Sequence, residues 1–148
     1  MNPFVCLTIP AQAEYLDIVR LTLYGFATKA GYTFEEIEDM KVAVAEACNN
    51  AILHAYGTAD SGTIELRLES GEEGMTISVK DHGQSFIFSE NAVVPTLLEQ
   101  TELSEVTVGG LGLFLMEALM DDVQVRSYDG SGTEIVLTKR LSRKEEMA

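Results

Sequence analysis

Residues Lys41–Tyr56, with the sequence KVAVAEACNNAILHAY, form the stretch around which the rest of the chain is organised. Upstream of it, Thr33 is followed three residues later by Glu36, a pairing that predicts a capping box at the start of a helix. We therefore expect one long helix from about Phe34 to Tyr56. Its apolar stripe consists of residues at helical spacing, namely Ile37, Met40, Val44, Cys48, Ala51 and Ala55.

A second, polar stripe on the same helix consists of Glu46, Asn50 and His54, each four residues after the last. At about 100° per residue, it lies roughly 120° around the helix from the apolar stripe. The neighbouring residues include several alanines, which allow another element or a ligand to approach closely. From this helix alone, the stripe is either a solvated face or part of a site.

Length and composition place the chain among globular proteins. Its 148 residues predict one domain, and 46% hydrophobic residues are enough for a core. The net charge of −14 argues against binding a nucleic-acid backbone and is compatible with a basic protein partner. No run is apolar enough for a membrane span or a secretory signal, so we expect a cytoplasmic protein. Cys6 and Cys48 are interpreted as small buried residues of a reducing compartment.

The order of the predicted elements indicates an α+β fold. We expect a two-layer α/β sandwich, in which a mixed, mostly antiparallel sheet carries helices on one face. A first strand ends at Pro10, and a helix over Ala11–Ala30 ends at Gly31. Four further strands follow from alternation of apolar and polar residues, over 63–69, 75–81, 123–128 and 133–138. Residues 87–108 lack a clear period and are expected to form a lid, and 141–148 a flexible tail.

The segment Gly109-Gly110-Leu111-Gly112 precedes a strongly amphipathic pattern, so we expect it to open a helix. Free backbone N–H groups in the first turn of such a helix can bind a phosphate. The segment is also compatible with a flexible hinge. It is not a P-loop, because no Gly-Lys-Ser/Thr follows.

Asp81 ends a predicted strand just before Gly83. Its carboxylate can accept a hydrogen bond from an exocyclic amine such as that of adenine, or it can simply begin a turn. Thr133, at the start of the last strand, can support Asp81 through a water or be an ordinary strand residue. Asn50 can offer an amide oxygen to Mg²⁺, and Glu46 can accept a proton from a hydroxyl group.

Taken together, the three segments resemble the gyrase-type (GHKL) histidine-kinase-like ATPase superfamily. The long helix resembles its N-box, DHGQSF (residues 81–86) its first glycine box, and GGLGLFLMEALMDDV (residues 109–123) its second. Within the superfamily, the chain is most similar to bacterial anti-sigma-factor serine/threonine-protein kinases. The resemblance spans roughly residues 4–140, and it implies one ATPase domain over residues 1–148.

The resemblance also implies a role for each site residue. Glu46 would be the catalytic base that deprotonates a serine or threonine of an anti-anti-sigma (STAS-type) substrate. Asn50 would hold Mg²⁺, and Asp81 would bind the adenine amino group. The implied ATP-contacting set is Asn50, His54, Asp81, Gly83, Gly109, Gly110, Leu111, Gly112 and Thr133. Such kinases act as homodimers that sequester a sigma factor.

The sequence departs from the family pattern at two places. Ser85 replaces the second glycine of the first box, which leaves that loop less conformational freedom. No Lys or Arg occurs from Asp81 through Gln124, so the lid supplies no cation to the γ-phosphate. Lys41, Arg20 or a partner residue would have to substitute. Two alternatives therefore stay open: an ATP-binding partner-switch scaffold without phosphotransfer, or a kinase of a non-sigma partner-switching pathway.

Overall fold

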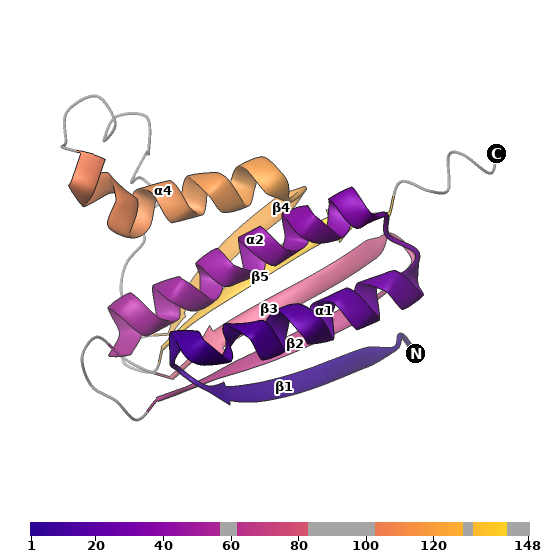
Figure 1. Cartoon of the computed structure of the whole chain (residues 1–148), viewed down its shortest axis with the longest axis horizontal. Helices are drawn as coiled ribbons and strands as arrows, with labels where there is room; N and C mark the ends of the chain where they lie inside the picture. The colour runs from indigo at the N-terminus through magenta and orange to yellow at the C-terminus, as the bar shows by residue number, and fades with distance from the viewer. Residues whose placement is uncertain (57–61, 83–102, 129–131, 142–148) are drawn as a thin grey trace.

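The computed structural model describes residues 1–56, 62–82, 103–128 and 132–141 (Figure 1). Five strands form one sheet in the order β1-β2-β3-β5-β4, and their bounds are Phe4–Pro10 (β1), Thr63–Ser70 (β2), Gly74–Asp81 (β3), Asp122–Tyr128 (β4) and Gly132–Arg140 (β5). All four pairings between these described strands are antiparallel. The expected α+β class is confirmed, and the sheet is more uniformly antiparallel than the mixed sheet that the sequence predicts.

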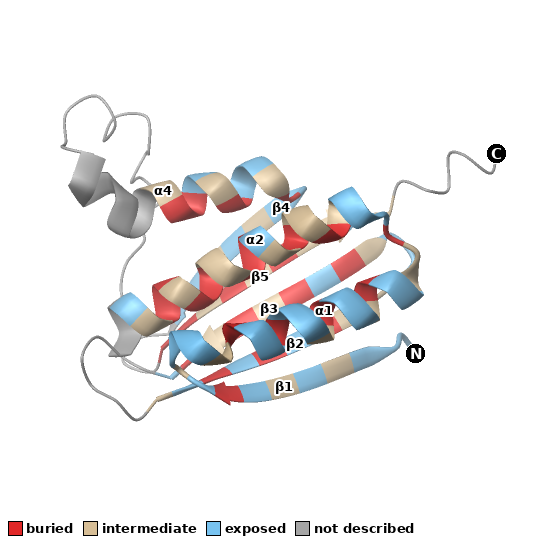
Figure 2. Ribbon diagram, in the orientation of Figure 1, coloured by how far each residue is buried: buried red, intermediate tan, exposed pale blue. Residues whose placement is uncertain are grey.

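The helices lie on one face of this sheet, as Figure 1 shows. In the described part of the chain they are η1, a 3₁₀ turn (Ala13–Tyr15), α1 (Leu16–Ala30), α2 (Phe34–Asn50), which continues as a π-helix, and α4 (Leu103–Leu119). Buried residues line the helix and strand surfaces that meet (Figure 2). The side chains with almost no exposure come from both layers and include Leu23, Ile37, Met40, Ile64, Leu66, Ile77, Met116 and Leu137. No helix in the described part of the chain is long and apolar enough to cross a membrane.

Alternation along the strands decides which sheet face is buried. In β2, Ile64, Leu66 and Leu68 are buried against the helices, whereas Glu65 and Arg67 point to the other side and are exposed. We call the helix-covered side the inner face and the other side the outer face. Cys48 is buried as predicted, but the prediction for Cys6 is wrong, because it is exposed. Cys6 pairs with Arg67 in the register, on the edge strand β1.

The turn between α1 and α2 forms as the sequence predicts. Gly31 ends α1 in the left-handed region at φ 99°. The capping box of α2 is complete: Thr33 Oγ1 accepts a hydrogen bond from the Glu36 N–H at 3.2 Å, and Glu36 Oε1 accepts one from the Thr33 N–H at 2.8 Å. A cap of this kind contributes about 1 kcal/mol to helix stability.

Two helix boundaries differ from the prediction. The long helix is α-helical only to Asn50 and continues as a π-helix, η2 (Ala51–Tyr56). The wider turn of a π-helix departs from the regular α-helical spacing on which the predicted stripe of Glu46, Asn50 and His54 depends. Helix α4 begins at Leu103, six residues before Gly109. A helix propagates readily from an existing nucleus, so the apolar helix after Gly112 extends upstream through the glycines.

Candidate functional site

Glu46 and Asn50 lie one turn apart on α2 and face α4 at Gly112. An ideal Cβ placed on Gly112 would lie 3.0 Å from Glu46 Oε1, 3.8 Å from Asn50 Nδ2 and 3.9 Å from Asn50 Oδ1. The absence of a side chain at Gly112 therefore lets α4 approach the carboxylate and the amide together. Three of the residues that the sequence singles out, from two motifs more than sixty positions apart, meet at this point.

Asn50 is buried without full hydrogen bonding. Its side chain is 3% exposed, and within the described part of the chain its Nδ2 has no hydrogen-bond partner. A buried polar group left unpaired costs about 1–3 kcal/mol, so such groups in native proteins usually have a functional explanation. Thr133 is 1% exposed, and its buried hydroxyl likewise has no hydrogen-bond partner among the described residues. Both groups are suited to a polar ligand that completes their hydrogen bonding.

Asp81 is the last residue of β3 and is 3% exposed. Gly132, the first residue of β5, packs against its backbone: a Cβ there would overlap the Asp81 carbonyl oxygen, and φ is +111°. Only glycine fits this position, and the contact brings Thr133 to the same end of the sheet. Gly132 is not among the site residues predicted from the sequence. Its place in the DGSG turn directly before Thr133 was a local sign, but its contact with Asp81 depends on the pairing of β3 with β5.

The two groups of residues lie at the same end of the molecule. The π-helix η2, which follows Asn50 directly, contacts both β3 and β5. Figure 1 shows the end of β3, the start of β5 and the C-terminal end of α2 with η2 on this side. The buried polar atoms of α2 and of the sheet therefore belong to the same end of the molecule.

A hollow of about 430 Å³ lies on the other side of Glu46. The residues that line it come from α1 and α2 and are Arg20, Glu38, Lys41, Val42, Ala45, Glu46 and Asn49. Within it, Lys41 Nζ lies 2.9 Å from Glu38 Oε2. Glu46 thus lies next to Gly112 of α4 and also lines this hollow.

The remaining predicted site residues either lie inside α4 or fall outside the described part of the chain. Gly109, Gly110 and Leu111 lie inside α4, so the prediction that the glycine segment opens a helix is wrong. Residues 103–108, predicted as part of the lid, belong to α4 as well. Gly83 and Ser85, the rest of the lid over residues 87–102 and the tail over 142–148 lie outside the described residues, as does the His54 side chain.

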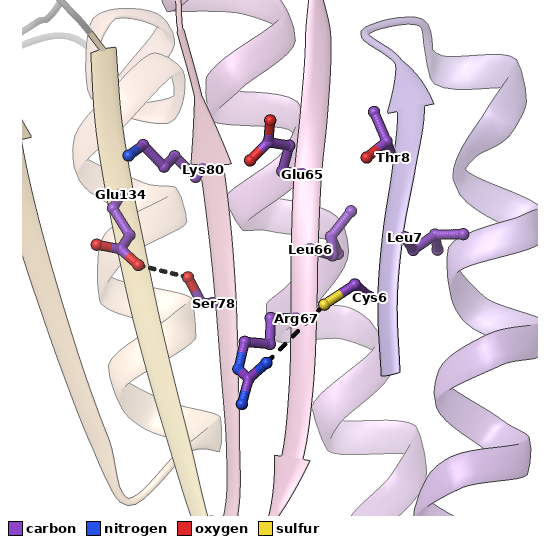
Figure 3. Close-up of a pocket in the computed structure, with 9 residues that line it drawn as sticks. All are labelled: Cys6, Leu7, Thr8, Glu65, Leu66, Arg67, Ser78, Lys80 and Glu134. Atoms are coloured by element: carbon purple, nitrogen blue, oxygen red, sulfur yellow. Dashed lines mark hydrogen bonds between the residues drawn. The ribbon is translucent and has the colours of Figure 1, made fainter. Parts of the chain in front are cut away.

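A further hollow, of about 250 Å³, lies on the outer face of the sheet (Figure 3). Ser78 Oγ donates to Glu134 Oε2 at 2.6 Å there, and Arg67 lies 4.0 Å from Cys6 Sγ. Arg67 also lies over the Phe4 ring, 4.0 Å from its centroid. These side chains are engaged with one another, in contrast to Asn50 and Thr133.

The donor set at Asn50 fits a magnesium ion carried by a phosphate ligand. Among the described residues, no group of three His, Cys, Asp or Glu side chains could hold a metal ion. The Asn50 amide oxygen is a hard donor, and Mg²⁺ commonly takes one or two protein oxygens together with phosphates and waters. The Asn50 oxygen can serve as one such ligand, and the Glu46 carboxylate beside it can receive a proton.

Comparison with known proteins agrees with this geometry. Residues 9–139 match the family described as histidine kinase-like ATPase domain. The serine-protein kinase RsbW of Bacillus subtilis is 42% identical over 141 residues, which are 94% of this chain and 86% of that protein.

Two solved structures have a similar fold. The structure of the RsbU and RsbW domains of Rv1364c from Mycobacterium tuberculosis has a TM-score of 0.67 at 24% identity, covering 94% of this chain and 32% of that one. The SiaB–SiaC complex from Pseudomonas aeruginosa gives a TM-score of 0.63 at 11% identity, covering 90% and 88%. Sequence motifs, site geometry and family match lead to one conclusion: the chain belongs to the histidine kinase-like ATPase domain family.

Proposed function

We propose that this chain is an ATP-dependent protein serine/threonine kinase that acts as an anti-sigma factor. The observation that carries the proposal is the meeting of the Glu46 carboxylate, the incompletely paired Asn50 amide and Gly112. A module that only binds a nucleotide has no need for a carboxylate at this place. The likeness to the serine-protein kinase RsbW over most of both chains supports the same activity.

The nucleotide would be held by residues from three elements. The Asp81 carboxylate would accept a hydrogen bond from the adenine amino group, with Thr133 assisting beside it and Gly83 leaving room for the base. Asn50 would provide its amide oxygen to Mg²⁺, which neutralises phosphate charge when bound. His54 would complete the proposed contacts. The backbone N–H groups of Gly109, Gly110, Leu111 and Gly112 lie beyond the first turn of α4, where a helix uses its N–H groups internally, so the phosphate contact predicted for them does not follow from this structure.

Glu46 would act as the general base. A substrate hydroxyl that enters through the hollow beside Arg20 and Lys41 reaches the carboxylate from the side away from Gly112. The proton passes to Glu46 while the hydroxyl oxygen bonds to the γ-phosphorus and the bond to the ADP leaving group breaks. Arg20 and Lys41 border the same hollow and are the proposed substitutes for the cation that the lid sequence lacks.

The substrate in this proposal is a STAS-type anti-anti-sigma protein, and the second partner is a sigma factor. Residues 1–148 would act as one ATPase domain and associate as a homodimer. Phosphorylation of the antagonist would release it and leave the sigma factor captive. One protein of similar fold was solved in a complex of two proteins, SiaB and SiaC, which supports a protein partner.

The experiment that tests the proposal follows transfer of labelled phosphate from ATP to a candidate antagonist protein. We expect Glu46→Gln to lower the transfer rate about 10²- to 10⁴-fold, the usual contribution of a general base. Its affinity for Mg·ATP should stay within about threefold of the parent value, since the carboxylate is not a proposed nucleotide ligand. Glu117→Gln, the same change at an exposed carboxylate of α4, is the matched control.

Two outcomes would contradict the proposal. If the parent protein binds Mg·ATP but forms no phosphoprotein with any antagonist that it binds, the chain is a nucleotide-binding scaffold. If Glu46→Gln transfers phosphate at the parent rate, the catalytic role of Glu46 is wrong.

A further inference from the structure

Gly112 is close to one atom in particular. An ideal Cβ at this position would lie 3.0 Å from Glu46 Oε1, which is tighter than an ordinary van der Waals contact. The two amide atoms of Asn50, at 3.8 and 3.9 Å, lie at ordinary contact distance. A side chain at residue 112 would therefore conflict with the carboxylate and would hardly disturb the amide.

Backbone conformation does not explain the glycine. The described glycines with positive φ are Gly31, Gly74 and Gly132, so Gly112 has a conformation that any residue can adopt. Glycine in the interior of a helix is unfavourable relative to alanine. The reason for glycine at this position is the space above Glu46, and it is independent of any phosphate contact made by the backbone.

We infer that Gly112 is a positioning residue for the Glu46 carboxylate, an inference that rests on the proposed kinase function. With no side chain at Gly112, Oε1 lies against α4, beside Asn50 and next to the hollow lined by Arg20. A methyl group at this position displaces the end of the Glu46 side chain, because a flexible side chain yields before two packed helices do. The carboxylate then shifts by a few tenths of an ångström while the two helices remain in place.

The expected result of Gly112→Ala is a separation of three measured quantities. Transfer to the antagonist protein should fall several-fold, since a misplacement of about 1 Å can cost about 100-fold and the contact at Gly112 calls for a smaller shift. The affinity for Mg·ATP should stay within about threefold of the parent value. The midpoint of thermal unfolding should be unchanged or higher, because alanine is the better helix former.

Gly25→Ala is the matched control. Gly25 also lies inside a helix, α1, and a Cβ there meets nothing within 4 Å. The same chemical change should leave transfer at the parent rate. In a Glu46→Gln background, Gly112→Ala should add little further loss, because the displaced group no longer acts as a base.

Several results would overturn the inference. One is parent-like transfer by Gly112→Ala. Another is a loss of Mg·ATP affinity as large as the loss of transfer, which would place the effect of Gly112 at the phosphates. A third is full multiplication of the two losses in the double variant. If the parent protein itself forms no phosphoprotein, the proposed function fails, a result distinct from all three.

Discussion

Buried polar groups at the two ends of strands β3 and β5 differ in their hydrogen bonding. At one end, the Tyr32 hydroxyl donates to the Lys139 carbonyl oxygen at 2.6 Å and accepts from the Met75 N–H at 2.8 Å. At the other end, Asn50 Nδ2 and the Thr133 hydroxyl are buried and have no partner within the described part of the chain. We infer that the paired polar groups stabilise this fold, whereas the unpaired ones indicate where a ligand is expected.

The end with Tyr32 is reinforced by further contacts between the layers. Lys139 Nζ donates to the Leu119 carbonyl oxygen at the end of α4, at 2.7 Å, and the Arg140 N–H donates to Asp121 Oδ2, also at 2.7 Å. Both bonds satisfy backbone groups at the edge of an element, where they would otherwise face water. This end therefore joins α4, β5 and the α1–α2 turn in a fixed arrangement.

The largest effect on stability should come from removing the paired hydroxyl. We expect Tyr32→Phe to lower the free energy of unfolding by about 1–3 kcal/mol, because Met75 N–H and the Lys139 carbonyl lose their partner. Mg·ATP affinity should not change, since Tyr32 lies at the far end of β3 from Asp81. Urea unfolding measures the first quantity and nucleotide titration the second. A weakened affinity for Mg·ATP would contradict the separation of the Tyr32 end from the nucleotide site.

The same hydroxyl predicts a dependence on pH. Burial raises the pKa of Tyr32 to about 12 from its ordinary value of about 10. The unfolded chain therefore loses this proton first, and stability that is fully present below pH 10 is lost as pH rises toward 12. The decline in unfolding free energy between these values should be smaller in Tyr32→Phe than in the parent protein. An equal decline in both would show that Tyr32 does not carry it.

A smaller effect, of opposite sign, should follow from removing the unpaired hydroxyl. Thr133→Val replaces a buried hydroxyl with a methyl group of similar size, so we expect the free energy of unfolding to rise by about 1 kcal/mol. Affinity for Mg·ATP should fall several-fold if the hydroxyl completes the adenine site. Loss of stability in this variant would mean that Thr133 has a structural partner, and the contrast with Tyr32 would fail.

Local sequence rules predicted the parts of the fold that depend on neighbours in the chain. The capping box at Thr33, the glycine that ends α1 and the alternation in β2 follow from nearby residues, and the structure confirms each. The three separated motifs also pointed to one site, and the structure brings Glu46, Asn50 and Gly112 together.

The remaining features depend on contacts between distant segments. The start of α4 at Leu103 and the π-helix after Asn50 are not encoded in the periodicity of the apolar residues. Gly132 is close to Asp81 only through the pairing of β3 with β5, fifty residues apart. The exposure of Cys6 follows from its place on the outer face of the sheet, where an apolar run alone does not assign a side.

The proposed nucleotide site depends most directly on the Asn50 side chain. The amide resonance of this side chain in a ¹⁵N-labelled protein reports whether the nucleotide binds beside it. The Nδ2 signal is assigned by its loss in Asn50→Asp, and the Gln124 amide, which is bonded to Asp122 Oδ2 at 3.2 Å, serves as the reference. We predict that the Asn50 signal shifts saturably with a non-hydrolysable ATP analogue and Mg²⁺ while the Gln124 signal stays in place. An unmoved Asn50 signal at saturating nucleotide would contradict the account.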